Sequence, residues 1–180
     1  MENLNSNTTN RPMLTGMFSD RDSAEQAYKA LHERGYQKDD VNVMMSDDTR
    51  KKHFKNDDRP STELGSKAME GAGTGSAIGG TLGAIIGAVA AIGTSLLIPG
   101  LGLVVAGPLA AALAGAGAGG VAGGLIGALI GAGIPEDRAK KYEEGIKNGR
   151  IVMGIHPRND EDASYIENQW RSSKGEEIYR

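Results

Sequence analysis

The residues that could carry out chemistry in this chain are three histidines and several pairs of acidic residues. His32, His53 and His156 lie too far apart in the sequence to show the spacing of a metal site. The acidic pairs fall at the ends or on the polar faces of expected helices, where carboxylates act as caps or face solvent. These pairs are Asp39 with Asp40, Glu143 with Glu144, and Asp160 with Asp162. The chain has no cysteine, which excludes disulfides, zinc–cysteine sites and cysteine nucleophiles. From these observations together we expect no catalytic residue, no metal site and no enzymatic activity.

Glycine-rich loops are a second candidate for chemistry, because their backbone amides can hold phosphates. A P-loop ends with glycine followed by lysine and then serine or threonine, and no glycine here is followed by that pair. The nearest match to the dinucleotide pattern, Gly73–Gly79, has one residue too many and follows no expected strand. We therefore expect no cofactor.

Charge also limits the range of partners. The formal net charge is −3, and no segment is strongly basic, so we expect no nucleic-acid partner. One basic run extends from Arg50 to Lys55 and is offset by Asp47, Asp48, Asp57 and Asp58. This run is typical of a solvated linker, and the alternative is contact with anionic lipid headgroups.

The middle of the chain has the strongest pattern. No charged residue occurs from Gly71 to Pro135, and small residues recur there at every fourth position in two runs. On a helix this spacing forms a stripe along one face, where two backbones can approach closely. We predict a glycine-zipper helical hairpin over residues 71–134, with arms over 71–95 and 108–131. The expected self-association interface comprises Gly75, Gly79, Gly83, Gly87, Gly115, Gly119, Gly123, Gly127 and Gly131.

The hairpin has three possible environments. Each arm would be roughly 36 Å long as a helix, and a bilayer core is about 30 Å thick. Basic residues near both ends, such as Lys67 and Arg138, favour the bacterial inner membrane with both termini in the cytoplasm. The alternative is a soluble cytoplasmic homo-oligomer in which the zipper forms a shared core, and a third possibility is a pore. A four-residue stripe drifts about 40° per step around a helix, which predicts more than one neighbour and hence self-assembly.

The polar ends of the chain predict a small α+β domain. Strands are expected over 13–18, 41–45, 150–155 and 177–179, with a helix after the first and third strands. Neither half can bury a core alone, and together they match the pattern of a ferredoxin-like split βαβ sandwich. We expect its core to contain Tyr28, Leu31, Ile166 and Trp170.

The expected organisation is therefore an α+β domain interrupted by the hairpin, which lies between its second and third strands. The segments are a disordered tail over 1–12, the first half of the domain over 13–45, a polar linker over 46–70, the hairpin over 71–134, and a helix with the second half of the domain over 135–180.

Several stretches resemble a known family. Residues 16–27, Arg34–Tyr36 and Val41–Met44 resemble the YflT-type domain of bacterial general stress proteins, including those named low-temperature-induced. The segments Ile98–Gly102 and Ala106–Gly115 resemble the glycine-rich centre of that group. The resemblance implies a non-enzymatic role in the bacterial stress response and supplies no functional residues. The expected partners are a second copy of the chain and the lipid bilayer.

Overall fold

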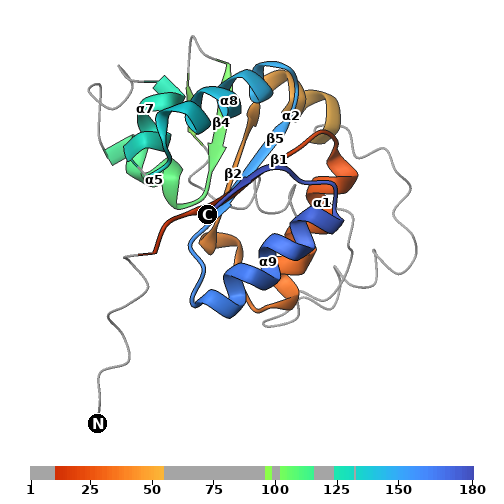
Figure 1. Ribbon diagram of the computed structural model, residues 1–180. Coiled ribbons are helices and arrows are strands. Elements are labelled where there is room, and N and C mark those ends of the chain that lie inside the picture. The colour runs from red at the N-terminus through yellow and green to blue at the C-terminus, as the bar shows by residue number, and fades with distance from the viewer. Residues whose placement is uncertain (1–10, 55–95, 99–101, 116–123, 132) are drawn as a thin grey trace, which may run out of the picture.

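The computed structural model describes residues 11–54, 96–98, 102–115, 124–131 and 133–180, and it places them in one antiparallel sheet with helices on both faces (Figure 1). Within these residues, the strands lie in the order β3-β4-β2-β5-β1-β6. The strands are β1 (Leu14–Phe18), β2 (Val41–Ser46), β3 (Leu96–Ile98), β4 (Leu103–Ala106), β5 (Ile151–Ile155) and β6 (Glu176–Tyr179). The helices are α1 (Arg21–Glu33), α2 (Asp47–Phe54), α5 (Pro108–Gly115), α7 (Gly124–Gly131), α8 (Glu136–Lys147) and α9 (Asp160–Ser172).

The polar ends of the chain form the elements that the sequence predicts, to within one or two residues. The Asp20 carboxylate accepts a hydrogen bond from the Ser23 amide at 2.8 Å and caps α1. The Asn159 side chain accepts one from the Asp162 amide at 2.7 Å and caps α9. Gly35 and Gly149 follow α1 and α8 with φ of +84° and +85°, the left-handed conformation that ends many helices.

Strand β5 joins the two ends of the chain into one sheet. It pairs with β1 on one side, where Leu14 faces Ile155, and with β2 on the other, where Val41 faces the same Ile155. The last strand, β6, pairs with the outer edge of β1. Neither polar half therefore forms a sheet of its own.

Helices α1 and α9 cover one face of the sheet (Figure 1). Tyr28, Leu31, Ile166 and Trp170 are all buried there, which confirms the predicted core. The Phe18 and Trp170 rings meet edge to face with centroids 5.6 Å apart, a favourable aromatic geometry.

The other face is covered by α5, α7 and α8 (Figure 1). The sequence predicts a helix after Pro135 and another from Pro108, but it does not predict that helices of the apolar middle pack on the sheet. Leu125 and Leu129 of α7 are fully buried and pack in the same core as Tyr142 and Ile146 of α8. The apolar middle of the chain therefore completes the second core of the α+β domain.

The structure corrects the predicted tip of the hairpin. Residues expected to connect two helices form β3 and β4, and β4 pairs antiparallel with β2, with Val43 opposite Ala106 and Ser46 opposite Leu103. Leu103 to Ala106 are all buried in the domain, so these residues belong to the sheet and do not form a connection between two helices. The physical reason is that a short apolar run rich in valine fits a buried strand as well as it fits a loop.

The second arm of the hairpin also differs from the prediction. A helix begins at Pro108 as expected, but Gly124, the first residue of α7, has φ of +58°. A right-handed helix cannot run through that conformation, so a single straight helix over 108–131 is wrong. The first arm, over 71–95, lies outside the described residues.

The predicted polar linker over 46–70 is wrong for its first residues, which belong to β2 and α2. Ser46 accepts a hydrogen bond from the Thr49 amide at 3.0 Å and so caps α2. Asp47 forms ion pairs with Arg50 and Lys51 one turn later. The acidic and basic residues that offset one another in this stretch are thus partly paired as ion pairs along α2. Residues 55–70 of the predicted linker lie outside the described part of the chain.

A close backbone contact fixes α5 on the sheet. Gly107 has φ of +96°, and a Cβ on it would lie 2.2 Å from the Val41 carbonyl oxygen. The buried Asn42 side chain accepts a hydrogen bond from the Leu109 amide at 2.7 Å and donates one to the Gly154 carbonyl at 3.4 Å. Asn42 thereby ties α5 to β2 and β5.

We expect Gly107→Ala to destabilise the fold more than Gly133→Ala does. Gly133 also has a left-handed φ, of +88°, but a Cβ there would meet no atom within 4 Å. The control therefore reports backbone strain alone, about 1 kcal/mol, whereas the clash at Gly107 adds roughly 2 kcal/mol or more. Urea unfolding of both variants measures the difference, and equal losses would contradict the close packing of α5 on β2.

Candidate functional site

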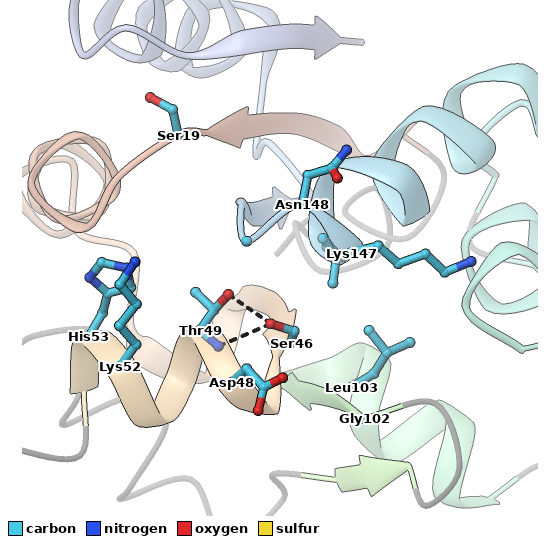
Figure 2. Close-up of a pocket in the computed structure, with 12 residues that line it drawn as sticks. Ser19, Ser46, Asp48, Thr49, Lys52, His53, Gly102, Leu103, Lys147 and Asn148 are labelled. Carbon is cyan, nitrogen blue, oxygen red and sulfur yellow. Dashed lines mark hydrogen bonds between the residues drawn. The ribbon is translucent and has the colours of Figure 1, made fainter.

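A polar pocket of about 560 Å³ lies at one end of the sheet, between α2 and the C-terminal end of α8 (Figure 2). Its walls come from four places in the chain. The lining residues are Ser19 after β1; Ser46, Asp48, Thr49, Lys52 and His53 of the β2–α2 segment; Gly102 and Leu103 at the start of β4; and Ile146, Lys147, Asn148 and Gly149 of α8 and its end. Its volume is within the range of small-molecule sites, but its walls are mostly polar.

Backbone contacts hold α2 beside the pocket. The Asp47 amide donates a hydrogen bond to the Gly102 carbonyl at 2.6 Å, which fixes the start of α2 against β4. At the other end, the Arg21 guanidinium donates to the His53 carbonyl at 2.7 Å. A cation at the C-terminal end of a helix also complements its dipole. Both ends of α2 are therefore attached to the domain.

The charges around the pocket are mixed, with an excess of cations. Lys52 forms no ion pair with any carboxylate among the described residues, whereas Lys147 lies 3.4 Å from Glu143. Burial, together with the nearby Lys52 and Arg21 charges, lowers the pKa of His53. His53 is therefore neutral at pH 7, and among the described residues Asp48 supplies the one carboxylate in the lining.

The side chains that line the pocket can bind polar ligands. Its groups are hydroxyls, a carboxylate, an amide, an imidazole and two ammonium groups. No cluster of three or more histidine, aspartate or glutamate side chains able to hold a metal occurs among the described residues. His32 lies on α1, His53 on α2, and His156 directly after β5.

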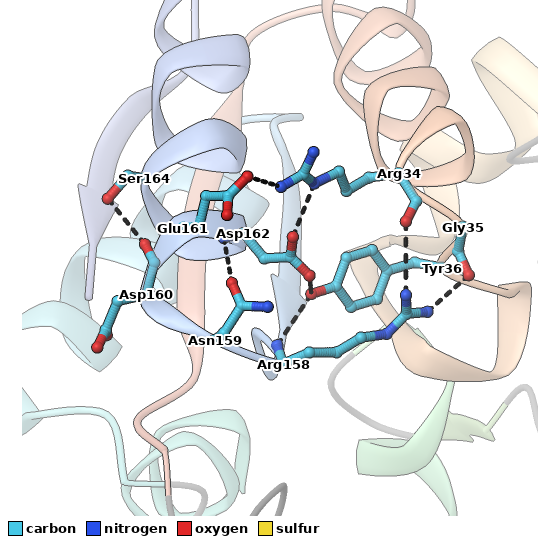
Figure 3. A network of polar contacts seen from close by, with 9 residues as sticks. All are labelled: Arg34, Gly35, Tyr36, Arg158, Asn159, Asp160, Glu161, Asp162 and Ser164. Carbon is cyan, nitrogen blue, oxygen red and sulfur yellow. Dashed lines mark hydrogen bonds and ion pairs between the residues drawn. The ribbon is translucent and has the colours of Figure 1, made fainter.

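A second polar centre links the end of α1 to the start of α9 (Figure 3). The Tyr36 hydroxyl donates a hydrogen bond to Asp162 at 2.8 Å and accepts one from the Arg158 amide at 2.9 Å. Arg34 donates to Asp162 at 2.7 Å and to Glu161 at 2.6 Å. The Arg158 guanidinium stacks 4.1 Å from the centre of the Tyr36 ring and donates to the Gly35 carbonyl.

The ionisation of this centre follows from its contacts. Burial raises the pKa of Tyr36 to about 12, so its hydroxyl remains a donor at neutral pH. Burial alone would also raise the pKa of Asp162, but hydrogen bonds from Arg34 and Tyr36 outweigh it and lower that pKa. Every polar group in the centre is thus used within the domain, and we interpret it as a structural connection.

The predicted self-association glycines are only partly described. Gly75, Gly79, Gly83, Gly87, Gly119 and Gly123 lie outside the described residues, and Gly115 is the last residue of α5. Gly127 and Gly131 lie one turn apart on α7 and are exposed, and a Cβ added at either would meet no atom of the described residues within 4 Å. Ile130 lies between them in the sequence and is 44 % exposed. Among the described residues, it is the large hydrophobic residue that is exposed to solvent.

The described helices of the glycine-rich middle are short. None of the helices in the described residues combines the length and the apolar character needed to cross a membrane.

Comparison of the chain with protein-family models, curated proteins and solved structures finds no match.

The pocket is the feature that sequence reasoning missed. Its residues are separated by more than 100 positions, from Ser19 to Gly149, and only the pairing of β5 between β1 and β2 brings them together. The one local signal is Ser46 followed three residues later by Thr49, before a charged run, which is typical of a helix start. Identifying that start would have placed α2, but not the opposite wall.

We expect Asp162→Asn to destabilise the protein at pH 7 by about 2 kcal/mol, because charged hydrogen bonds to Arg34 and Tyr36 are lost. Folding lowers the pKa of Asp162 below its ordinary value of 3.8, so the carboxylate stabilises the folded state above that pH. This stabilisation disappears as the pH falls through the lowered pKa. Urea unfolding of both proteins at pH 7 and pH 3 should therefore show a smaller difference at pH 3. A difference that does not change with pH would contradict an ionised Asp162 in the fold.

Proposed function

We propose that this chain is a non-enzymatic protein that self-associates through the outer face of α7. The observation that carries the proposal is Ile130, which is 44 % exposed between the exposed glycines Gly127 and Gly131. An exposed large aliphatic side chain beside two glycines forms a protrusion next to a shallow space. Such a surface can pack against its own copy about a two-fold axis.

The space over the glycines supports this proposal. No atom of the described residues lies within 4 Å of the Cβ position of Gly127 or Gly131, so packing within the described part of the fold does not require glycine there. Glycine within a helix costs about 1 kcal/mol relative to alanine. Close approach of a second backbone is a reason to keep glycine at that spacing.

The proposal includes a ferredoxin-like architecture for the four strands that come from the polar ends of the chain. The order β6-β1-β5-β2, with α1 and α9 on one face, supports it. In this view the segment between β2 and α8 is an insertion that adds β3 and β4 to the sheet edge and covers the second face. The resemblance to general stress proteins supports a role in the bacterial stress response.

Contact with protein is favoured over contact with lipid for α7. Leu125 and Leu129, which a membrane helix would present to lipid, are buried against the domain. The remaining exposed face is narrow and rich in glycine, which contributes little to membrane insertion. A lipid-bound state of the inner membrane would have to depend on residues outside the described part of the chain, and it is an outcome of the experiment below.

We expect the double variant Gly127→Ala, Gly131→Ala to fold at least as stably as the wild type and to associate more weakly. Alanine fits the open space and favours the helix by up to about 1 kcal/mol per site. In a dimer the same methyl groups would separate the two backbones, which raises the dissociation constant by roughly tenfold. Sedimentation equilibrium of the full chain measures association, and urea unfolding measures stability.

Ile130→Lys provides an independent test of the same face, with Asn168→Lys as its control. Asn168 is exposed on α9, across the sheet from α7, so the control adds the same charge elsewhere. Ile130→Lys should dissociate the assembly, while Asn168→Lys should leave it intact. Unchanged assembly in all variants, or a monomer that floats with lipid vesicles, would contradict self-association through α7.

A further inference from the structure

We infer that the pocket between α2 and α8 binds a small oxyanion, the phosphate or carboxylate group of a small molecule. The inference is independent of self-association, because α7 contributes nothing to the lining. It depends on three observations: a hydroxyl hydrogen without an acceptor, an excess of cations, and an opposite wall close enough to complete the site.

The first observation concerns the hydroxyls of Ser46 and Thr49. Their oxygens lie 2.7 Å apart, and either can donate to the other, but one contact uses only one of the two hydroxyl hydrogens. Ser46 also accepts from the Thr49 amide at 3.0 Å. The other hydroxyl hydrogen, on buried Thr49 or on half-buried Ser46 according to which of them donates, has no acceptor among the described residues. Both hydroxyls line the pocket, so on either assignment a donor is available to a ligand that brings an acceptor oxygen.

The second observation is the charge that faces the pocket from each wall. Lys52 and Lys147 outnumber Asp48, and neutral His53 adds polarity without charge at pH 7. Lys147 forms an ion pair with Glu143, whereas Lys52 has no carboxylate partner in the described part of the chain. Lys52 is therefore the cation available to a ligand, and an ammonium group with a nearby hydroxyl donor suits an oxyanion.

The third observation is the opposite wall. A Cβ on Gly149 would lie 3.7 Å from the Thr49 hydroxyl oxygen, so the end of α8 directly faces the first turn of α2. Asn148 and Ser19 complete this side of the opening (Figure 2). The Asn148 amide forms no side-chain hydrogen bond with any described residue and can donate to a second ligand oxygen. A ligand between these walls would contact both α2 and α8.

Equilibrium dialysis of the full chain against inorganic phosphate tests the inference, with acetate as a second probe and the ionic strength held constant by sodium chloride. We expect saturable binding of one ion per chain for at least one probe. The probe that binds more tightly distinguishes a phosphate from a carboxylate ligand. Lys52→Gln and Thr49→Val should each weaken binding by roughly tenfold, because each removes a donor to the anion.

Lys51→Gln is the matched control, since Lys51 is the neighbouring lysine of α2 and does not line the pocket. It should leave the dissociation constant within about twofold of the wild type. Thermal unfolding shows whether the Thr49→Val variant folds. If that variant does not fold, the Lys52→Gln variant still tests the inference. The inference would be overturned if neither phosphate nor acetate showed saturable binding. It would also be overturned if Lys51→Gln weakened anion binding as much as Lys52→Gln does.

Discussion

The pairing of β5 with both β1 and β2 is the constraint on which the rest of the structure depends. It places a strand from the last third of the chain between two strands from the first third. The end of α1 then meets the start of α9, where Tyr36, Arg34 and Asp162 form their hydrogen bonds. The free edge of β2 becomes available to β4, and the ends of α2 and α8 meet around the pocket.

A sheet with two apolar faces must be covered on both sides, and this requirement explains the glycine-rich middle. Helices α1 and α9 cover one face, and the middle of the chain supplies α5 and α7 for the other. Its glycines have different roles there. Gly107 is required by the contact with the Val41 carbonyl, whereas Gly127 and Gly131 face open space, which is where a partner can approach.

Much of the domain could be predicted from the sequence because its signals are local. Caps such as Asp20 and Asn159 and helix-ending glycines such as Gly35 and Gly149 act within one or two turns of the chain. The strands β3 and β4 could not be predicted, because their short apolar runs are ambiguous until β2 offers a free edge. The pocket could not be predicted either, since its walls are distant in sequence and meet only in the folded sheet.

Hydrogen–deuterium exchange of the full chain tests the central claim, that the apolar middle is part of the sheet. Strands that belong to one cooperative unit open together, so amides of β4 should be protected to the same degree as those of β5. Peptides that cover residues 103–106 and 151–155 report the two strands separately. Comparable slow exchange is the result predicted by a shared sheet. Rapid exchange over 103–106 beside slow exchange over 151–155 would contradict it.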